Sequence, residues 1–238
     1  AVVIPTFNEI DNLPQLIKSL EEIVPRHELR LIIVDDNSPD GTADAAESLN
    51  SIYGNISIYR RGGKLGIGSA VLDGLKMALS APDTKFIVTM DADLSHDPRE
   101  ILRLLGGAEG VDLVQGSRYI KGGKIVGWGL YRRFISRAAN ILYRLLFRTK
   151  LHDHTTYYRV YSRRCAQAIV DELKCSGYEF AIASVLFCRD RGYMMREVPI
   201  TFVERTRGNS KLGVSDVAKG FGFASKTFLS RALKKLRF

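Results

Sequence analysis

Residues 85–98, KFIVTMDADLSHDP, place an apolar run directly before three carboxylates. The run KFIVTM predicts a buried strand, since apolar and β-branched residues follow one another in it. Asp91, Asp93 and Asp97 follow at the point where the run ends. Because unpaired carboxylates are costly to bury, this stretch predicts a strand that ends at a polar site.

The first 117 residues repeat this order of apolar run and helical segment. Between the runs, segments such as NLPQLIKSLEEIV and GSAVLDGLKMAL carry apolar residues at helical spacing. Alternating strands and helices predict βαβ units and a mostly parallel central sheet, the three-layer αβα arrangement of a Rossmann-like α/β fold. The predicted strands are residues 1–7, 29–36, 55–59, 85–91 and 111–117.

Three of these predicted strands end in polar residues. In sheets of this kind, ligands bind at the carboxyl ends of the strands, where such groups meet. We therefore expect a site at this edge of the sheet, formed by Asn8–Glu9, Asp35–Asp36 and Asp91–Asp93.

The second half of the chain has a different pattern. Residues 127–148 predict a basic amphipathic helix, with Leu130, Phe134, Ala138, Ile141 and Leu145 on one stripe. Further on, the pattern predicts a strand at 156–162, helices near 163–173 and 179–190, an extended segment at 193–205 and a basic amphipathic tail at 214–238. No linker separates these segments, so one domain is expected over residues 1–238, in three parts: 1–117, 118–213 and the tail at 214–238.

Positive charge is concentrated in the second half. The formal net charge is +9, yet residues 118–164 hold twelve Lys and Arg against the single acid Asp153, and residues 205–238 hold nine against Asp216. This segregation predicts a carboxylate-lined site beside a surface that attracts anions. Three cysteines without a C-x-x-C pair argue against a disulfide framework or a zinc ribbon, and no apolar stretch is long enough to span a bilayer.

Asp91 and Asp93 are the candidate metal ligands. At i and i+2 in an extended segment, both side chains leave the same side of the chain and can face one cation. Carboxylate oxygens favour Mg²⁺ or Mn²⁺, which keep open positions for phosphate oxygens. The alternative is a capping cluster, in which Ser95 and Asp97 cap the helix after Pro98. The position at the end of an apolar strand favours the metal.

Two further motifs near the predicted sheet edge allow more than one interpretation. Asp35 and Asp36 could accept from nucleotide hydroxyls, or they could belong only to a turn that caps the next helix. The stretch GGKLGIGSA, residues 62–70, suggests a phosphate loop, but Lys64 precedes Gly66 and Gly68 instead of following them. A glycine-rich turn into a helix is the favoured interpretation.

His152 and His154 have the spacing of a metal pair, but no Cys or Glu stands nearby at ligand spacing. A structural role is therefore favoured for both histidines. The single tryptophan, Trp128, is expected to be a packing or interfacial residue.

These motifs, in this order, resemble the inverting family-2 glycosyltransferases of the GT-A fold, and among them the dolichyl-phosphate mannose synthases, particularly the eukaryotic-type catalytic subunit. The likeness covers nearly the whole chain. VIPTFNEIDNL, IIVDDNSPDGT and MDADLSHDP are shared across many glycosyltransferases, whereas GWGLYRRFISRAAN and EVPITFVERTRGNSKLG are more specific to polyprenyl-phosphate transferases. The resemblance implies GDP-mannose as donor, dolichyl or another polyprenyl phosphate as acceptor, and Mg²⁺ or Mn²⁺ as cofactor.

The resemblance also implies roles for particular residues. Asp91 and Asp93 would bind the metal, and Arg132 or Arg133 would meet the acceptor phosphate. Cations and metal would stabilise the charge that develops on the departing nucleoside diphosphate, with Arg118 among the catalytic groups. Since the acceptor is already an anionic nucleophile, no strong general base is needed. The residues implied for the nucleotide sugar are Pro5, Phe7, Glu9, Val34, Asp36, Asp91, Ala92, Asp93, Arg118, Arg205 and Lys211.

The chain departs from the family pattern at three places. Phe7 replaces a Tyr, and Thr156–Tyr157 stand where small residues are usual. Ala181 and Ala183 replace Gln and Glu, which puts in doubt any role of those polar side chains.

The basic segments 127–148 and 214–238 predict work at a membrane surface. The resemblance implies that this surface is the cytoplasmic face of the endoplasmic reticulum or of a bacterial plasma membrane. It also implies that residues 1–117 bind the nucleotide sugar and that residues 118–213 bind the acceptor. For 127–148, packing of the apolar stripe on the sheet is an equal alternative. The tail could also dock a small membrane protein. A related enzyme that uses UDP-glucose stays open as an alternative, while a nucleic-acid-binding module would leave the strand-end acids unexplained.

Overall fold

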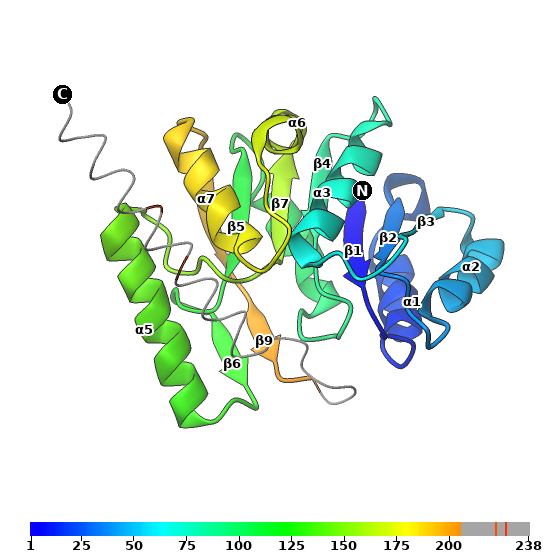
Figure 1. Cartoon of the computed structure of the whole chain (residues 1–238), viewed down its shortest axis with the longest axis horizontal. Coiled ribbons are helices and arrows are strands. Elements are labelled where there is room, and N and C mark those ends of the chain that lie inside the picture. The colour runs from blue at the N-terminus through cyan, green and yellow to red at the C-terminus, as the bar shows by residue number, and fades with distance from the viewer. Residues whose placement is uncertain (206–221, 223–226, 228–238) are drawn as a thin grey trace.

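A seven-stranded sheet forms the centre of the molecule, in the strand order β3-β2-β1-β4-β7-β5-β8 (Figure 1). The computed structural model describes residues 1–205, Gly222 and Thr227. Within these residues, six strands of the sheet run parallel, and β7 alone runs against its neighbours β4 and β5. The strands are β1 (Val2–Thr6), β2 (Leu31–Asp35), β3 (Ile56–Arg60), β4 (Phe86–Thr89), β5 (Leu113–Ser117), β7 (Arg159–Ser162) and β8 (Met195–Pro199).

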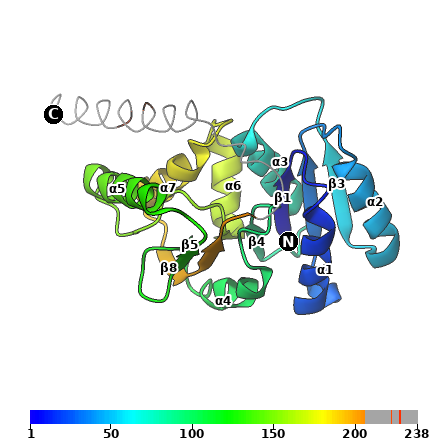
Figure 2. The same ribbon diagram turned by 90° about the horizontal axis from the view of Figure 1, so that it is seen from below.

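Helices cover both faces of the sheet, as the view in Figure 2 shows. One face packs on α1, α2 and α4 through a cluster that includes Leu16, Ala46 and Leu104. The other face packs on α3, α6 and α7. The helices are α1 (Leu13–Ile23), α2 (Thr42–Tyr53), α3 (Ile67–Leu79), α4 (Ile101–Gly106), α5 (Leu130–Phe147), α6 (Arg163–Glu172) and α7 (Phe180–Asp190), with 3₁₀ turns η1 (Arg26–Glu28) and η2 (Pro98–Glu100).

The predicted three-layer αβα sandwich is confirmed. Strands β1 and β2 are continuous apolar runs because helices bury them on both faces, as parallel sheets require. Two features were not predicted: the antiparallel direction of β7, and a second sheet in which β6 (Lys124–Val126) pairs with β9 (Thr201–Val203). The basic tail at 214–238 lies outside the described residues, apart from Gly222 and Thr227.

Helix α5 packs through a different stripe from the one that its sequence suggests. Asn140, Tyr143 and Phe147 are buried, the two aromatic residues against Ile182 and Leu186 of α7. The predicted stripe faces outward, with Leu130 83%, Phe134 73% and Leu145 69% exposed. Packing of the predicted stripe on the sheet is therefore wrong.

Candidate active site

A cavity of about 800 Å³ opens at the carboxyl ends of the central strands, between the sheet and α5. Its lining contains two groups of residues with opposite charge. We call one group the carboxylate wall, which consists of Glu9, Asp36, Asp91 and Asp93. We call the other group the arginine wall, which consists of Arg118, Trp128 and Arg132.

Each strand that leads into the carboxylate wall turns away through a residue with left-handed backbone. Asn8 follows β1 with φ 54°, Asn37 follows β2 with φ 59°, and Leu94 follows β4 with φ 61°. Asn tolerates this region, whereas a leucine is strained there. The turn at Leu94 returns the chain so that the Ser95 N–H donates to Asp93 Oδ1 at 3.0 Å.

The two acids at the end of β2 have separate roles. Asp35 is a turn residue: its carboxylate accepts from the Thr6 hydroxyl at 2.8 Å and from the Ser38 N–H at 2.7 Å. Asp36 lines the cavity, pairs with the buried Arg61 guanidinium and accepts from the Gly66 N–H at 3.1 Å. The carboxylate of Asp36 thus fixes the turn that leads into α3.

That glycine-rich turn is built for close packing. The Ser69 N–H donates to the Ser176 carbonyl at 3.1 Å, so a neighbouring loop occupies the start of α3. A Cβ on Gly66 would lie 2.5 Å from the Ser176 oxygen, and one on Gly68 would lie 2.6 Å from the Gly177 oxygen. The glycines are needed because backbone meets backbone here, which supports the turn interpretation over a phosphate loop.

Asp91 and Asp93 lie together at the end of β4. Burial and the charge of Asp93 raise the pKa of the Asp91 carboxyl to about 8, while the Arg205 guanidinium opposes the shift. Arg205 pairs with Asp93 Oδ2 at 2.7 Å. Two carboxylates that repel each other in a shielded place favour a cation between them.

This pair fits Mg²⁺ or Mn²⁺ held jointly with a ligand. In the part of the chain that the structure describes, no group of three or more His, Cys, Asp or Glu is arranged to hold a metal. Mg²⁺ commonly binds through one or two carboxylates, several waters and substrate phosphates. Asp91 and Asp93 would supply the protein's share of such a site.

His96 is a site residue that the sequence analysis missed. Its Nδ1 accepts from the Asp91 N–H at 3.1 Å, its Nε2 lies 3.1 Å from the Thr156 hydroxyl, and its ring stacks on Tyr158. Burial lowers the pKa of His96 to about 4, so the ring is neutral at pH 7. A neutral imidazole can accept at Nδ1, and it thereby fixes the backbone of Asp91. Its position three residues after Asp93 was the available signal.

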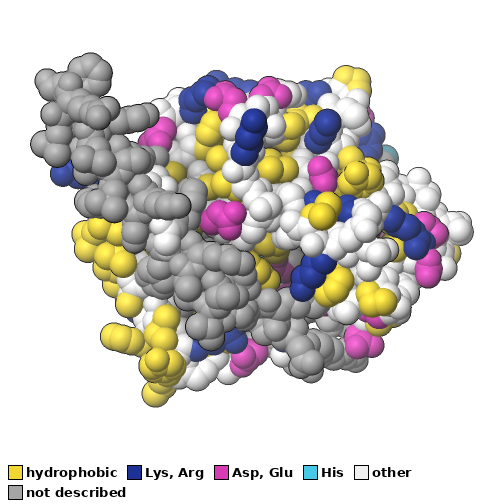
Figure 3. Space-filling view, in the orientation of Figure 1, with side chains coloured by type: hydrophobic (Ala, Val, Ile, Leu, Met, Phe, Trp, Pro, Cys, Tyr) yellow, Lys and Arg dark blue, Asp and Glu magenta, His cyan; other side chains and the backbone are white. Residues whose placement is uncertain are grey.

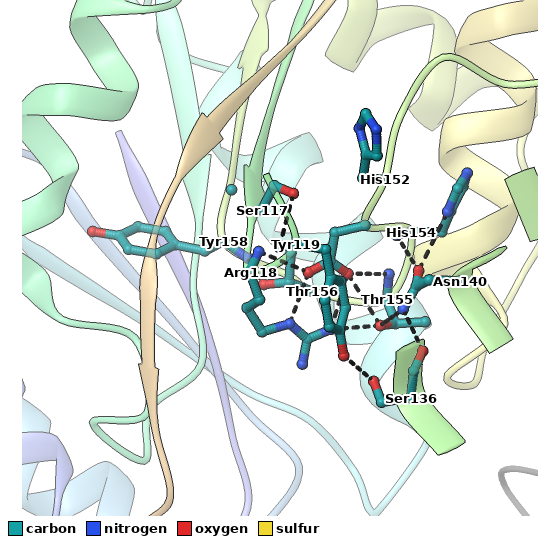
Figure 4. Close-up of polar contacts among 12 residues, drawn as sticks. Ser117, Arg118, Tyr119, Ser136, Asn140, His152, His154, Thr155, Thr156 and Tyr158 are labelled. Atoms are coloured by element: carbon teal, nitrogen blue, oxygen red, sulfur yellow. Dashed lines mark hydrogen bonds and ion pairs between the residues drawn. The ribbon is translucent and has the colours of Figure 1, made fainter. Parts of the chain in front are cut away.

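Arg118 is the buried arginine of the arginine wall (Figure 4). Its Nε and Nη2 donate to the two carboxylate oxygens of Asp153 at 2.7 and 2.9 Å, and Nη2 also donates to the Thr155 hydroxyl at 2.6 Å. Burial alone would raise the pKa of Asp153, but the charge and hydrogen bonds of Arg118 hold it below its usual value. Arg118 therefore joins the cavity to the chain before β7.

Arg132 and Arg133 diverge at the start of α5. Arg132 lines the cavity, lies 4.1 Å over the Trp128 ring and donates to Glu204 at 2.8 Å. Arg133 donates to the Ile125 carbonyl at 2.7 Å and does not line the cavity. Of the two arginines expected to meet the acceptor, Arg132 has the suitable position.

The other expected site residues are placed as follows. Phe7 lines the cavity without a hydroxyl, and the Lys64 ammonium lies 4.4 Å from the centre of its ring. The Val34 side chain is fully buried in the core, so only its backbone is near the strand end. Lys211 lies outside the described residues. Pro5, Glu9, Asp36, Ala92 and Arg205 all line the cavity.

The histidines near β7 do not form a metal pair. His152 Nδ1 pairs with Glu197 at 2.7 Å, whereas His154 Nε2 contacts the Thr149 hydroxyl at 2.6 Å. Figure 4 shows the two rings well apart. The backbone N–H of His154 also donates to the Asn140 side chain, and this hydrogen bond joins α5 to the chain before β7.

The other two departures from the family pattern also contribute residues to the cavity lining. Tyr157 lines it and stacks on Phe180 with ring centres 6.3 Å apart. Ala181 also lines the cavity, and its carbonyl accepts from the buried Arg159 at 2.7 Å. Ala183 is buried and does not line the cavity.

The chain is similar to proteins of known activity. The family described as glycosyl transferase family 2 matches residues 1–170. An undecaprenyl-phosphate mannosyltransferase of Micrococcus luteus is 38% identical over 211 residues, 88% of this chain and 86% of the relative. A polyprenol monophosphomannose synthase of Mycolicibacterium smegmatis is 37% identical over 219 residues, 91% of this chain and 82% of the relative.

A solved structure shares the fold. Glucosyl-3-phosphoglycerate synthase from Mycobacterium tuberculosis, in complex with Mn²⁺, uridine diphosphate and phosphoglyceric acid, superimposes with a TM-score of 0.66. The two chains are 20% identical, and the match covers 97% of this chain and 77% of the other. The expected GT-A fold is thus confirmed.

Proposed function

Because the chain belongs to glycosyl transferase family 2, we propose that it transfers mannose from GDP-mannose to the phosphate of a polyprenyl lipid such as dolichyl phosphate. The observation that carries this proposal is one cavity that joins the Asp91–Asp93 pair to Arg118 and Arg132. The two carboxylates, with a metal ion, suit a sugar diphosphate, and the two arginines suit a lipid phosphate. The names of the two relatives support mannose and a polyprenyl phosphate.

In the reaction, a phosphate oxygen of the acceptor attacks C1 of the sugar as the bond from C1 to the diphosphate oxygen breaks. The acceptor oxygen is already anionic, so no residue has to remove a proton from it. Arg132 would hold the acceptor phosphate, and Arg205, which pairs with Asp93, would stabilise the negative charge that develops on the departing diphosphate. A bound Mg²⁺ or Mn²⁺ would supply charge neutralisation at that diphosphate.

We also propose that the enzyme works at a membrane surface. The outward face of α5 exposes large apolar side chains with Arg133, Arg137 and Arg144 on the same helix (Figure 3). A basic helix with an apolar face can lie in the headgroup layer of anionic lipid. Within the described residues, no helix is long and apolar enough to cross a bilayer.

The activity is tested with the purified chain, a short polyprenyl phosphate and a panel of nucleotide sugars. We expect GDP-mannose to give mannosyl lipid and the matched alcohol without phosphate to give none. Faster transfer from UDP-glucose would show that UDP-glucose, and not GDP-mannose, is the donor. Failure of every nucleotide sugar would contradict the proposal.

The membrane proposal has its own test. We expect the wild type to sediment with anionic vesicles at low salt, and a Leu130→Ser, Phe134→Ser variant to sediment less. Ile52→Ser is the matched control, because Ile52 is 68% exposed on α2, away from α5. Equal loss in both variants would contradict a role for α5.

A further inference from the structure

Trp128 carries a polar group that the structure leaves without a partner. The residue lies just before α5 in the arginine wall and is only 8% exposed. Its indole Nε1–H is shielded from solvent and has no hydrogen-bond partner among the described residues. Since a buried donor without an acceptor costs free energy, such a group calls for an explanation.

Packing alone does not explain an indole at this position. The nearest backbone carbonyls in sequence bind other donors and not the indole: the Ile125 carbonyl accepts from Arg133, and the Val126 carbonyl accepts from the Glu204 N–H. A phenylalanine would fill much of the same space without an unpaired donor. The N–H is therefore the feature to account for.

Two guanidinium groups lie against the same ring. Arg132 is 4.1 Å from the ring centre and Arg118 is 5.4 Å from it. Phe202 supports the ring edge-on at 5.2 Å. An N–H donor next to two cations, in the wall of a cavity, has the composition of an oxyanion site.

A phosphate can replace Glu204 in the ion pair that Arg132 makes next to the indole. Arg132 is paired with Glu204, and the two side chains are 46% and 41% exposed. A phosphate carries more negative charge than a carboxylate and offers three oxygens, so it can take Arg132 from Glu204. A phosphate held by Arg132 would then lie beside the Trp128 ring, within reach of its N–H edge after a small shift of the side chains.

We infer that Trp128 is a binding residue for the acceptor, whose phosphate receives a hydrogen bond from the indole N–H beside Arg118 and Arg132. The identity of the ligand rests on the proposed function. The residue would distinguish a lipid phosphate from the lipid alcohol, because an alcohol brings no charge to displace Glu204.

The single tryptophan allows a direct test, because the 238-residue chain labelled with ¹⁵N-tryptophan gives one indole N–H signal. We expect titration of the full chain with farnesyl phosphate to move this signal downfield to saturation, and farnesol to leave it in place. GDP with Mg²⁺, which belongs to the other wall, should move it far less. An indole signal that farnesyl phosphate does not move would overturn the inference.

A second test uses Trp128→Phe, which keeps an aromatic ring for Arg132 but removes the donor. We expect the KM for the lipid phosphate to rise about ten-fold, with kcat and the KM for the donor nearly unchanged. An unchanged acceptor KM would overturn the inference and leave the proposed function intact. Absence of transfer by the wild type would instead overturn the proposed function. Should the variant not fold, the titration of the wild type decides alone.

Discussion

The two walls of the cavity are held in place by different kinds of contact. In the carboxylate wall, Asp36 and Asp93 accept from backbone N–H groups next to the ends of buried strands. In the arginine wall, Arg132 is held by the face of an aromatic ring and a half-exposed carboxylate. Backbone contacts fix the first wall before any ligand binds, whereas the second wall contains contacts that a ligand can replace. A substitution in the carboxylate wall should therefore lower the turnover. In the arginine wall, a substitution should lower either the stability or the affinity for the acceptor, according to whether the residue supports the fold or binds the ligand.

The largest effect is expected at the carboxylate pair. Asp91→Asn or Asp93→Asn should lower the turnover about a thousand-fold, because the amide cannot neutralise a metal bound to the diphosphate. The rate of mannosyl transfer at saturating donor measures this effect. EDTA should silence the wild type, and added Mg²⁺ or Mn²⁺ should restore it.

Asp97→Asn is the matched control for this prediction. Asp97 belongs to the same stretch but pairs with Arg99 and caps η2, and it does not line the cavity. Its replacement by another capping residue should leave turnover within about two-fold. Full activity of the wild type in EDTA would contradict the metal role.

The next effect separates the two arginines of the other wall. Arg118→Met leaves the Asp153 carboxylate buried without its counterion, so the free energy of unfolding should fall by about 3 kcal/mol. Arg132→Met breaks only a half-exposed pair, so stability should change by less than about 0.5 kcal/mol while the acceptor KM rises. Urea unfolding and steady-state kinetics measure the two effects. Similar losses of stability in both variants would remove the distinction between framework and binding residues.

The attachment of α5 should depend on pH through His154. Burial lowers the pKa of His154 to about 4, whereas an unfolded histidine has a pKa of about 6.5. The unfolded state therefore binds the proton first, and the stability present above pH 6.5 is lost as pH falls toward 4. Between pH 7 and pH 5 this loss should be about 2 kcal/mol.

Other groups also titrate in this range, so the measurement compares the wild type with His154→Asn in urea at several pH values. The variant should be less stable at pH 7 and less sensitive to acid. Parallel curves for the two proteins would mean that His154 is not the source of the effect.

The smallest effect tests how rigid the carboxylate wall is. Gly68→Ala places a Cβ 2.6 Å from the Gly177 oxygen and 2.8 Å from Phe180 Cβ, so backbone has to move. We expect a loss of about 1 kcal/mol in the free energy of unfolding. Gly63→Ala, which meets nothing within 4 Å, is the control. An unchanged free energy of unfolding in Gly68→Ala would show that the backbone next to the carboxylate wall can move at little cost.

The sequence predicted the carboxylate wall better than the arginine wall for a physical reason. An apolar strand followed by Asp91 and Asp93 is a local pattern, and parallel strands bring their ends to one edge. The contacts of Trp128 and Arg118 with Phe202, and of Arg132 with Glu204, join residues about seventy or more positions apart, so no local pattern contains them. The roles of Arg118 and Arg132 came from the resemblance to known enzymes.

Two features of the fold that the sequence analysis did not predict have similar causes. The short run Arg159–Ser162 does not reveal in which direction its strand runs, so the reversal of β7 is decided only by its neighbours. Helix α5 carries apolar residues on more than one face, and the stripe that packs contains Asn140, a polar residue held by the His154 N–H. A prediction from the spacing of apolar residues therefore does not choose a stripe with a polar residue as the buried face of the helix.

The reversed strand β7 has a consequence for the segment that precedes it. Because β7 is antiparallel, its first residue, Arg159, lies opposite Thr89 at the end of β4, and the preceding segment 153–158 enters at the cavity. A strand of four residues spans about 13 Å. Run in the parallel direction, the same strand would deliver Asp153 and Thr155 to the opposite edge, roughly that distance from Arg118. The direction of β7 therefore decides that Asp153 and Thr155 meet Arg118 at the cavity, although the segment 153–158 itself belongs to no strand.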